Sequence, residues 1–422
     1  MKQVTADFET VATDPRFSFL GNVRVGTDVS VAELRKLYDG VILAYGASSD
    51  RGMGIPGEEL NNVCSARAFV NWYNGHPDFR NFAPNLEAED VVIIGQGNVA
   101  IDCARVLCKT PAELAETDIA AHAFDALARS KVKRVHVVGR RGHVQAAMTM
   151  KELREVTRLA DCSFHVLSEE LARGRTAASM TETETARAKK RMDALLAEQA
   201  KLEVNDTAKK SKQLFLRFLL QPHSCLPSAT DAKSVGSFDF DVTALEGEAD
   251  KQSAKVSGKK ETIKAGMVLK SIGYKSMPLP GVPFDDRRAV VRNVKGRVVK
   301  DAAGEEPEVG LYCAGWLKRG PTGIVGTNIT DARETVACLL EDRAAGRLPS
   351  SSSSSRSALA ILRDMLVSKG KKREHLVPWE GWRRLDELEL QAGKEKGKSR
   401  EKFVVVADML KEVEKVQVKE VV

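Results

Sequence analysis

A glycine-containing turn at residues 95–100 constrains the fold of this chain more than any other feature. It reads Gly-Gln-Gly-Asn-Val-Ala and lies between an apolar run at 89–95 (EDVVIIG), predicted to be a strand, and a predicted amphipathic helix at 98–108. The first glycine of such a turn permits a tight bend, the second lets the backbone approach a pyrophosphate, and the small third residue lets the helix pack closely. We interpret it as a dinucleotide-binding turn; an ordinary glycine-rich turn is the alternative.

The next predicted strand, residues 132–138 (VKRVHVV), ends in two arginines. Arg140 and Arg141 follow Gly139, at the position where an NAD site usually carries an acid for the ribose hydroxyl. Two guanidinium groups suit a 2′-phosphate, which favours NADP over NAD. The spacing, 140 − 95 = 45 residues, exceeds the usual ~20, and a helical insertion at 112–130 accounts for the difference. Two solvated arginines at a strand end are the alternative.

A second glycine-rich turn joins a predicted strand at 308–315 to a predicted helix at about 328–345. Its sequence, WLKRGPTGIV at 316–325, offers exposed amides at the positive end of a helix dipole. Such a terminus can hold an anionic group, for instance the N1/O2 edge of a reduced flavin, beside the flat ring of Trp316. A single tryptophan is more often part of a core, so both interpretations stay open.

Composition narrows the class of protein. Lysine and arginine exceed the acidic residues by 65 − 58 = 7, and aromatic residues make up 5%, which does not describe a nucleic-acid-binding face. An acidic protein partner fits this charge. The seven cysteines contain no CxxC pair, so we expect a reducing compartment and no metal site. A length of 422 residues with ordinary globular composition predicts two domains. No apolar run approaches the roughly 20 residues that a membrane-spanning helix needs, so no span is expected.

The remaining chain has an α/β rhythm. A helix is predicted at 31–37, a buried strand at 39–47, an exposed helix within 180–213 and a strand-rich region at 214–275. Six serines at 350–355 predict a flexible loop, and a Lys-rich basic tail follows it.

Several long motifs together resemble the adrenodoxin reductase family, the mitochondrial-type ferredoxin–NADP reductases. The resemblance extends over nearly the whole chain, from GNVRVG at 21–26 to Pro378 and Trp379. The segments that carry it are IPGEEL at 55–60, VCSARAFVNWYNG at 63–75, GQGNVAID at 95–102, VVGRRG at 137–142, KELRE at 151–155, SIGYKS at 271–276 and CAGWLKRGPTGIV at 313–325.

The resemblance implies a mitochondrial flavoenzyme that transfers hydride from NADPH to FAD and single electrons to a [2Fe-2S] ferredoxin. A flavin is required because nicotinamide gives two electrons and the cluster accepts one. A mitochondrial location is implied by the family alone, since residues 1–20 do not resemble a presequence. No nucleic acid is expected as a partner, and any contact with a membrane would be peripheral.

The resemblance also implies roles for individual residues. Asp102 is a candidate catalytic residue on the nicotinamide side, with a solvated or capping role as the alternative. The residues implied for NADP are Gly95, Gln96, Gly97, Asn98 and Val99 at the pyrophosphate, Arg140 and Arg141 at the 2′-phosphate, Glu152 at the ribose, and Gly323. Those implied for FAD are Val25 at the adenine half and Trp316, Gly323, Ile324 and Val325 at the isoalloxazine.

A basic surface is implied for docking of an acidic ferredoxin by electrostatic attraction. Its residues are Arg154, Arg187, Lys189, Lys190 and Arg191. Solvated helix faces are the alternative interpretation.

One departure from the family pattern concerns the beginning of the chain. The strand, GxGxxG turn and helix that hold the FAD pyrophosphate in the family do not precede Val25. We therefore expect a truncated chain or an incomplete gene model that lacks on the order of 70 residues of its FAD domain. For this chain the alternative function is an FAD-deficient, NADP-binding protein without catalysis.

The predicted fold is α/β, with two doubly wound dinucleotide-binding domains. The NADP domain, at 50–280, is inserted into an FAD domain formed by 1–49 and 281–422 and incomplete at its N-terminus. A reductase subunit of the amidotransferase or pyrimidine-reducing type would share the Gly-Asn-Val-Ala turn. It commonly adds cysteine clusters for iron-sulfur centres, and the sequence contains no such cluster.

Overall fold

The structure is a computed structural model that describes residues 4–202, 210–301, 303–304, 306–323, 325–349 and 356–420. Its chain forms two compact units. The first unit consists of Met1–Arg51, Gly273–Leu388 and Val406–Val422, and the second of Gly52–Ile272 and Glu389–Val405.

The predicted domain limits, 49/50 and 280/281, lie near the limits of these units, but one segment differs. The prediction assigns all of 281–422 to the FAD domain, whereas Glu389–Val405 belongs to the second unit. The reason is a set of contacts that sequence spacing does not reveal. Lys398 Nζ donates to the carbonyl of Ile119 at 2.9 Å, and Lys402 forms an ion pair with Asp118. The serine run at 350–355 lies outside the described residues.

A six-stranded parallel sheet forms the centre of the second unit. Its strand order is β3-β11-β4-β5-β7-β6, and the strands alternate with helices along the chain as the sequence predicts. The strands are β3 (Val63–Ser65), β4 (Asp90–Ile94), β5 (Arg134–Val138), β6 (Cys162–Val166), β7 (Lys212–Arg217) and β11 (Met267–Lys270).

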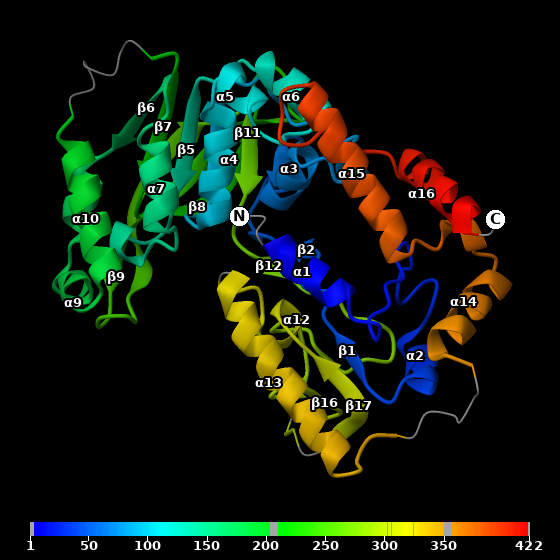
Figure 1. Ribbon diagram of the computed structural model, residues 1–422. Helices are drawn as coiled ribbons and strands as arrows, with labels where there is room; N and C mark the ends of the chain where they lie inside the picture. The colour runs from blue at the N-terminus through cyan, green and yellow to red at the C-terminus, as the bar shows by residue number, and fades with distance from the viewer. Residues whose placement is uncertain are drawn as a thin grey trace. The chain divides into compact units, whose positions relative to one another are not determined.

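One face of this sheet is covered by helices, among which α4 (Asn98–Cys108) and α7 (Met150–Val156) lie side by side (Figure 1). The inward residues of α4, including Ala100, Ala104 and Leu107, are buried against Val91 and Ile93 of the sheet. The other elements of this unit are α3 (Ala66–Tyr73), η1 (Pro77–Phe79), α5 (Pro111–Ala115), α6 (Ala121–Ala128), η2 (His143–Gln145), α8 (Ser168–Gly174), α9 (Ala177–Thr185) and α10 (Arg187–Ala200). Helices α5 and α6 fill the insertion predicted at 112–130.

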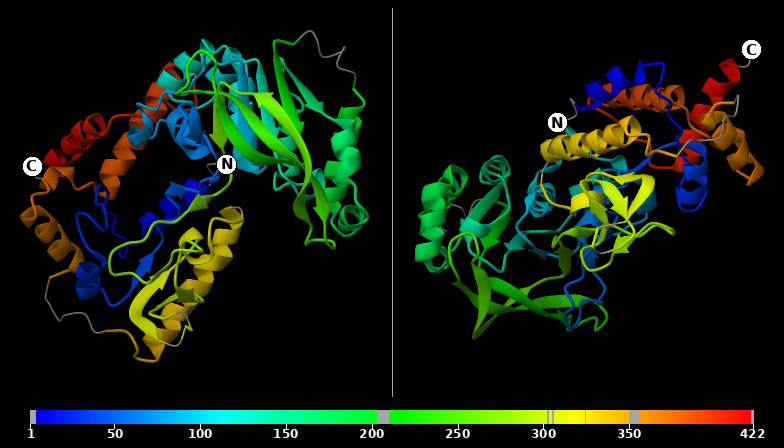
Figure 2. Two further views of the ribbon diagram at one scale, coloured as in Figure 1. Left: turned by 180° about the vertical axis from the view of Figure 1, so that it is seen from behind. Right: turned by 90° about the horizontal axis from the view of Figure 1, so that it is seen from below.

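The opposite face packs against a three-stranded antiparallel sheet, β8 (Leu220–Pro227), β9 (Val235–Glu246) and β10 (Ser253–Lys264). Phe238 and Phe240 of β9 are buried with Val92 and Ile94 of β4. The long green strands of this sheet run beside each other in both views of Figure 2. β10 is an edge strand, and its pairing with β9 shifts register between Val256 and Lys260.

The first unit contains a four-stranded sheet of order β1-β17-β16-β15. Its strands are β1 (Val41–Leu43), β15 (Asn293–Val294), β16 (Arg297–Val299) and β17 (Pro307–Cys313). Two short antiparallel pairs join β2 (Ser49–Asp50) to β12 (Tyr274–Lys275) and β13 (Phe284–Asp285) to β14 (Val290–Val291). The helices are α1 (Val4–Ala12), α2 (Val31–Leu37), α12 (Trp316–Arg319), α13 (Val325–Ala344), α14 (Ala358–Ser368), η3 (Arg373–His375), α15 (Trp379–Glu395), which continues into the second unit, and α16 (Val406–Glu420).

The strand predicted at 39–47 is shorter and less buried than expected. It pairs in parallel with β17 through Val41, Ile42 and Leu43, and only Leu43 is buried. Ile42 is 40% exposed. The prediction of a strand is therefore confirmed, and the prediction that it is buried is wrong for Val41 and Ile42.

Candidate functional site

The turn predicted to bind a dinucleotide joins β4 to α4 and requires a glycine at its first position. Gly95 has φ +116°, a backbone conformation that other residues rarely adopt. A Cβ atom placed on Gly95 would lie 2.2 Å from the carbonyl oxygen of Ser271. The structure therefore contains the tight bend that the sequence predicts at Gly95.

The N-terminus of α4 has the chemistry of an anion site. Gly97 occupies the N-cap position and supplies no side-chain cap, and a Cβ on it would meet nothing within 4 Å. Within the described part of the chain, the N–H groups of Asn98 and Val99 donate to no acceptor. Unpaired amides and the positive end of the helix dipole together favour a phosphate here.

The side chains of Gln96 and Asn98 have structural partners that the sequence did not reveal. Gln96 Nε2 donates to the carbonyl of Arg217 on β7 at 2.7 Å. Asn98 Oδ1 accepts the N–H of Thr149 at 2.8 Å, which fastens the start of α7 to the start of α4. Asn98 Nδ2 donates to no acceptor among the described residues, so this group and the backbone N–H of Asn98 are both available to a pyrophosphate.

Arg140 and Arg141 lie at the end of β5, with their backbone fixed and their side chains exposed. The carbonyl of Arg140 accepts from Thr243 Oγ1 at 2.8 Å, and that of Arg141 accepts from the N–H of Leu219 at 3.1 Å. Neither guanidinium has a hydrogen bond or ion pair among the residues that the structure describes. Two unpaired cations at this edge fit a 2′-phosphate.

Asp102, predicted to lie on the nicotinamide side, and Glu152, predicted to contact the ribose beside the 2′-phosphate, meet at the guanidinium of Arg105. Glu152 lies 3.1 Å from Arg105 Nη1, Glu155 lies 2.6 Å from the same atom, and Asp102 pairs with Arg105 Nη2. Burial raises the pKa of Asp102 above its ordinary value, against the opposing effect of Arg105. Asp102 is thus part of an ion-pair cluster instead of a helix cap, and its catalytic role stays a prediction.

The segment predicted to border a flavin is a short helix between glycines. α12 begins after Gly315 (φ +71°) and ends at Gly320 (φ +86°), and Gly323 also has positive φ (+83°). Trp316 is half-buried, with its ring centroid 5.7 Å from that of Tyr274.

Two observations in this segment fit a bound aromatic cofactor. The indole Nε1 of Trp316 is buried and has no partner in the described chain, which is uncommon for a polar atom. An open pocket of about 420 Å³ follows the turn and is lined by Arg319, Thr322, Gly323, Thr327, Thr330, Asp331 and Glu334.

The other residues predicted for FAD are only partly described. Ile324 lies outside the described residues, and Val325 is placed only as the first residue of α13. Val25 is half-buried, and its backbone forms a bridge with Val29.

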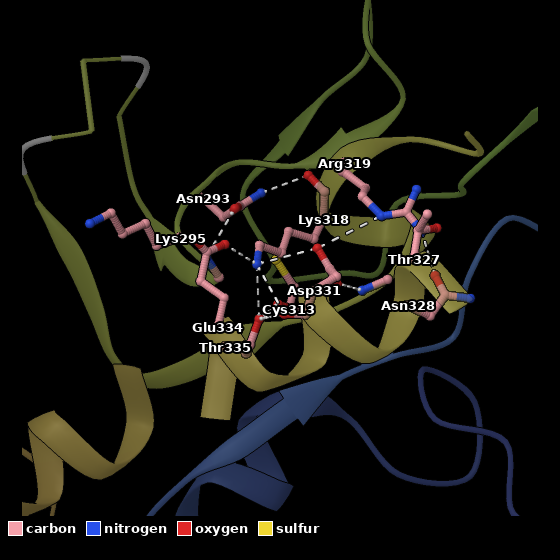
Figure 3. Close-up of polar contacts among 12 residues, drawn as sticks. Asn293, Lys295, Cys313, Lys318, Arg319, Thr327, Asn328, Asp331, Glu334 and Thr335 are labelled. Atoms are coloured by element: carbon pink, nitrogen blue, oxygen red, sulfur yellow. Dashed lines mark hydrogen bonds and ion pairs between the residues drawn. The ribbon is translucent and has the colours of Figure 1, made fainter. Parts of the chain in front are cut away.

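An ion-pair network around the buried Lys318 and Asp331, missed by the sequence analysis, fastens α12 to α13 (Figure 3). Lys318 Nζ lies 2.6 Å from Glu334, 3.3 Å from Asp331 Oδ1 and 3.2 Å from Thr335 Oγ1. The other carboxylate oxygen of Asp331 accepts the N–H of Gly315. The sequence contains the charged residues at 318, 331 and 334, but only the tertiary structure shows that they are in contact.

The predicted partner residues lie on α7 and α10 and differ in availability. Arg154, Arg187, Lys190 and Arg191 are exposed. Lys189 instead lies 2.7 Å from the buried carboxylate of Glu182 and 2.9 Å from Asp250. Its charge is therefore compensated within the protein.

Comparison with known proteins identifies the family to which the chain belongs. No protein-family model matches the chain. It is 44% identical over 408 residues to the mitochondrial NADPH:adrenodoxin oxidoreductase of Arabidopsis thaliana, covering 96% of this chain and 83% of that protein. It is 41% identical over 424 residues to the human enzyme of the same name, covering 97% and 81%. The chain belongs to the NADPH:adrenodoxin oxidoreductase family.

Bacterial relatives agree with this assignment in sequence and fold. The chain is 35% identical over 412 residues to the NADPH-ferredoxin reductase FprA of Mycobacterium leprae, covering 97% of this chain and 86% of that protein. The solved structure of Mycobacterium tuberculosis FprA in complex with NADPH is 35% identical, with a TM-score of 0.86 over 97% of this chain and 86% of that chain. The predicted family and α/β fold class are confirmed, and the electron-transfer enzyme is favoured over the non-catalytic alternative.

Proposed function

We propose that this chain is an FAD-dependent oxidoreductase that transfers electrons from NADPH to a [2Fe-2S] ferredoxin of the adrenodoxin type. The observation that carries the proposal is the identity of 44% over 96% of the chain with a named NADPH:adrenodoxin oxidoreductase. The site geometry supports it, because the turn after β4 and the arginine pair after β5 supply what NADPH requires.

The NADPH half of the reaction depends on holding a charged ligand in one orientation. We propose that the free amides at the start of α4 bind the pyrophosphate and that Arg140 and Arg141 bind the 2′-phosphate. Gly95 permits the tight bend, and Gly97, where a Cβ would meet nothing within 4 Å, lets the ligand approach the backbone closely. Glu152 is proposed to contact the ribose and Asp102 the nicotinamide side, although both already pair with Arg105.

The flavin half is proposed to lie at the turn after β17. FAD, when bound, supplies the conversion of a two-electron hydride into two one-electron transfers. Trp316 would border the ring system, Gly323 and the N-terminus of α13 would approach it through backbone amides, and Val25 would lie near the adenine half. The network of Lys318 and Asp331 holds Gly315 and Trp316 in place for this role.

The function is tested with the purified, FAD-loaded protein, NADPH and an adrenodoxin-type ferredoxin, with cytochrome c as the final electron acceptor. Reduction of cytochrome c should depend on NADPH and on the ferredoxin, and NADH should be a poor donor. Absence of ferredoxin-dependent reduction by a preparation that binds both FAD and NADPH would contradict the proposal.

We further propose that the ferredoxin is acidic and docks on the exposed cations of α7 and α10. Arg154, Arg187, Lys190 and Arg191 supply this charge, whereas Lys189 contributes less because of its internal ion pairs. Opposite charges accelerate diffusional encounter, and salt screens them over a Debye length of about 10 Å at 0.1 M and 3 Å at 1 M.

Charge reversal at Lys190 tests this surface. Lys190→Glu should slow association with ferredoxin severalfold at low salt and change little at 1 M salt, measured by stopped flow. Lys255→Glu, at an exposed lysine of β10, is the matched control and should leave the rate unchanged. An association rate that is flat from low to high salt would refute electrostatic docking on this surface.

A mitochondrial location is proposed from the plant and animal relatives, whose names include it, although a bacterial FprA is also a relative. Among the described residues, no helix has the length and apolar character needed to cross a bilayer. Any association with a membrane is therefore proposed to be peripheral.

A further inference from the structure

The turn that carries Arg140 and Arg141 is anchored on both sides, and the two anchors are of different kinds. On its N-terminal side, backbone contacts hold it to neighbouring strands, since the N–H of Gly139 donates to the carbonyl of Arg217 at 3.0 Å. On its C-terminal side the next residue but one is a histidine, and its side chain makes the attachment. The position of the arginines therefore depends in part on what holds this histidine.

His143 is fully buried and bonds to a helix fifty residues away in sequence. Its Nε2 lies 2.8 Å from Asp193 Oδ1 on α10, and the ring packs edge-on against Phe218 at 5.7 Å between centroids. Asp193 Oδ1 also accepts from Arg175 Nε at 2.8 Å. Asp193 thus keeps a cationic partner even when His143 is replaced.

The tautomer of His143 follows from its surroundings. Its Nδ1 is buried and has no hydrogen-bond partner within the described residues, so the ring proton belongs on Nε2, where Asp193 accepts it. Burial lowers the pKa of His143, against the opposing hydrogen bond to Asp193, and the neutral ring therefore donates a single directed bond.

The packing around the turn leaves little room for adjustment. A Cβ on Gly142 would lie 3.3 Å from the Cα of Gly174, and a Cβ on Gly174 would lie 3.1 Å from His143 Nδ1. Gln145, at the end of η2, donates to Ser179 Oγ on α9 at 3.2 Å. The segment after the arginines is thus attached to α9 and α10 by hydrogen bonds and packs against Gly174 of α8, while the two guanidinium groups have no hydrogen bond in the described structure.

We propose that His143 and Asp193 are positioning residues for NADPH, which fix the turn so that Arg140 and Arg141 converge on the 2′-phosphate. The inference rests on the proposed NADP site and extends it to two side chains that touch neither cofactor. Because NADH lacks the 2′-phosphate, loss of this anchor should affect NADPH selectively. A residue needed only for folding would affect both nucleotides or neither.

The test measures binding of NADPH and NADH to the FAD-loaded protein by calorimetry, together with KM and kcat. His143→Phe keeps the ring volume and leaves Asp193 paired with Arg175. It should raise the Kd and KM for NADPH about tenfold, as expected for loss of one directed hydrogen bond to a charged group. Binding of NADH and kcat at saturating NADPH should stay unchanged.

Two further variants separate positioning from stability. Asp193→Asn retains an oxygen that accepts from Nε2 and should recover most NADPH affinity, whereas Asp193→Ala should match His143→Phe. Arg175→Met removes the other partner of Asp193 and should leave the NADPH to NADH ratio close to that of the wild type. Asn98→Ala, which loosens the pyrophosphate turn shared by both nucleotides, should weaken both equally.

Equal losses of NADPH and NADH in His143→Phe, or no loss of either, would overturn the proposal. The readout is independent of the proposed function, because nucleotide selectivity is measured by binding. If the wild-type protein binds NADPH selectively but does not reduce ferredoxin, the proposed function fails while the positioning role stays testable. If the wild-type protein does not prefer NADPH, both the NADP site and the positioning role are wrong.

Discussion

Replacement of both Arg140 and Arg141 by alanine is expected to remove the preference for NADPH over NADH. Each charge-assisted bond to a phosphate contributes about 1.5–3 kcal/mol, so loss of both should weaken NADPH binding by at least about 100-fold. NADH has no 2′-phosphate and should bind nearly as before. The effect should be large because the two guanidinium groups are exposed and have no partner in the described chain that would compete for them.

The measurement is a pair of binding titrations, with NADPH and with NADH, on the wild-type, single-variant and double-variant proteins. Arg154→Ala is the matched control, since Arg154 is an exposed arginine of the same unit that is assigned to ferredoxin instead of NADPH. A double variant that loses both nucleotides to the same extent would show that the arginines support the turn and do not recognise the phosphate.

Lys318→Met is expected to destabilise the first unit by about 3 kcal/mol, because it leaves the buried carboxylate of Asp331 with only the longer ion pair to Arg319 at 3.8 Å. The residue is only 8% exposed, and its ammonium group compensates Asp331 and Glu334. A replacement of similar length cannot supply this charge. The loss should appear as a lower melting temperature and as easier release of FAD, because Asp331 also holds the N–H of Gly315 next to Trp316.

Two controls distinguish the loss of stability caused by an unpaired buried charge from that caused by the loss of a surface ion pair. Lys369→Met removes a partly exposed ion pair with Glu33, and it should lower the melting temperature much less than Lys318→Met does. Lys318→Met combined with Asp331→Asn should regain part of the stability, since the unpaired charge is then gone. A Lys318→Met protein as stable as the Lys369→Met control would refute the structural role assigned to this network.

Local patterns predicted the elements that carry the site. The helix predicted at 98–108 is α4 with the same limits, and the helix predicted at 31–37 is α2. Gly95 could be assigned to a tight bend because few other residues tolerate its φ. These successes share a cause, since helix periodicity and glycine geometry are properties of a few neighbouring residues.

Side-chain partners far apart in sequence were not predictable in the same way. The partner of Gln96 is the carbonyl of Arg217, and that of His143 is Asp193, so both depend on tertiary packing. Lys189 was grouped with its exposed neighbours because a charge run does not reveal which member turns inward to Glu182. The exposure of Ile42 likewise depends on which elements cover β1, which its own sequence does not encode.

The edge strand β10 bears on how this protein behaves at high concentration. Among the described residues no strand pairs with its outer edge, and unpaired backbone groups at such an edge can template intermolecular pairing. The exposed lysines Lys255, Lys259 and Lys264 and the register shift between Val256 and Lys260 interrupt that edge with charge and with irregular twist. Neutralising these lysines should therefore promote aggregation through β10 and leave NADPH binding intact. Surface variants that lose these charges should therefore aggregate during expression and crystallisation.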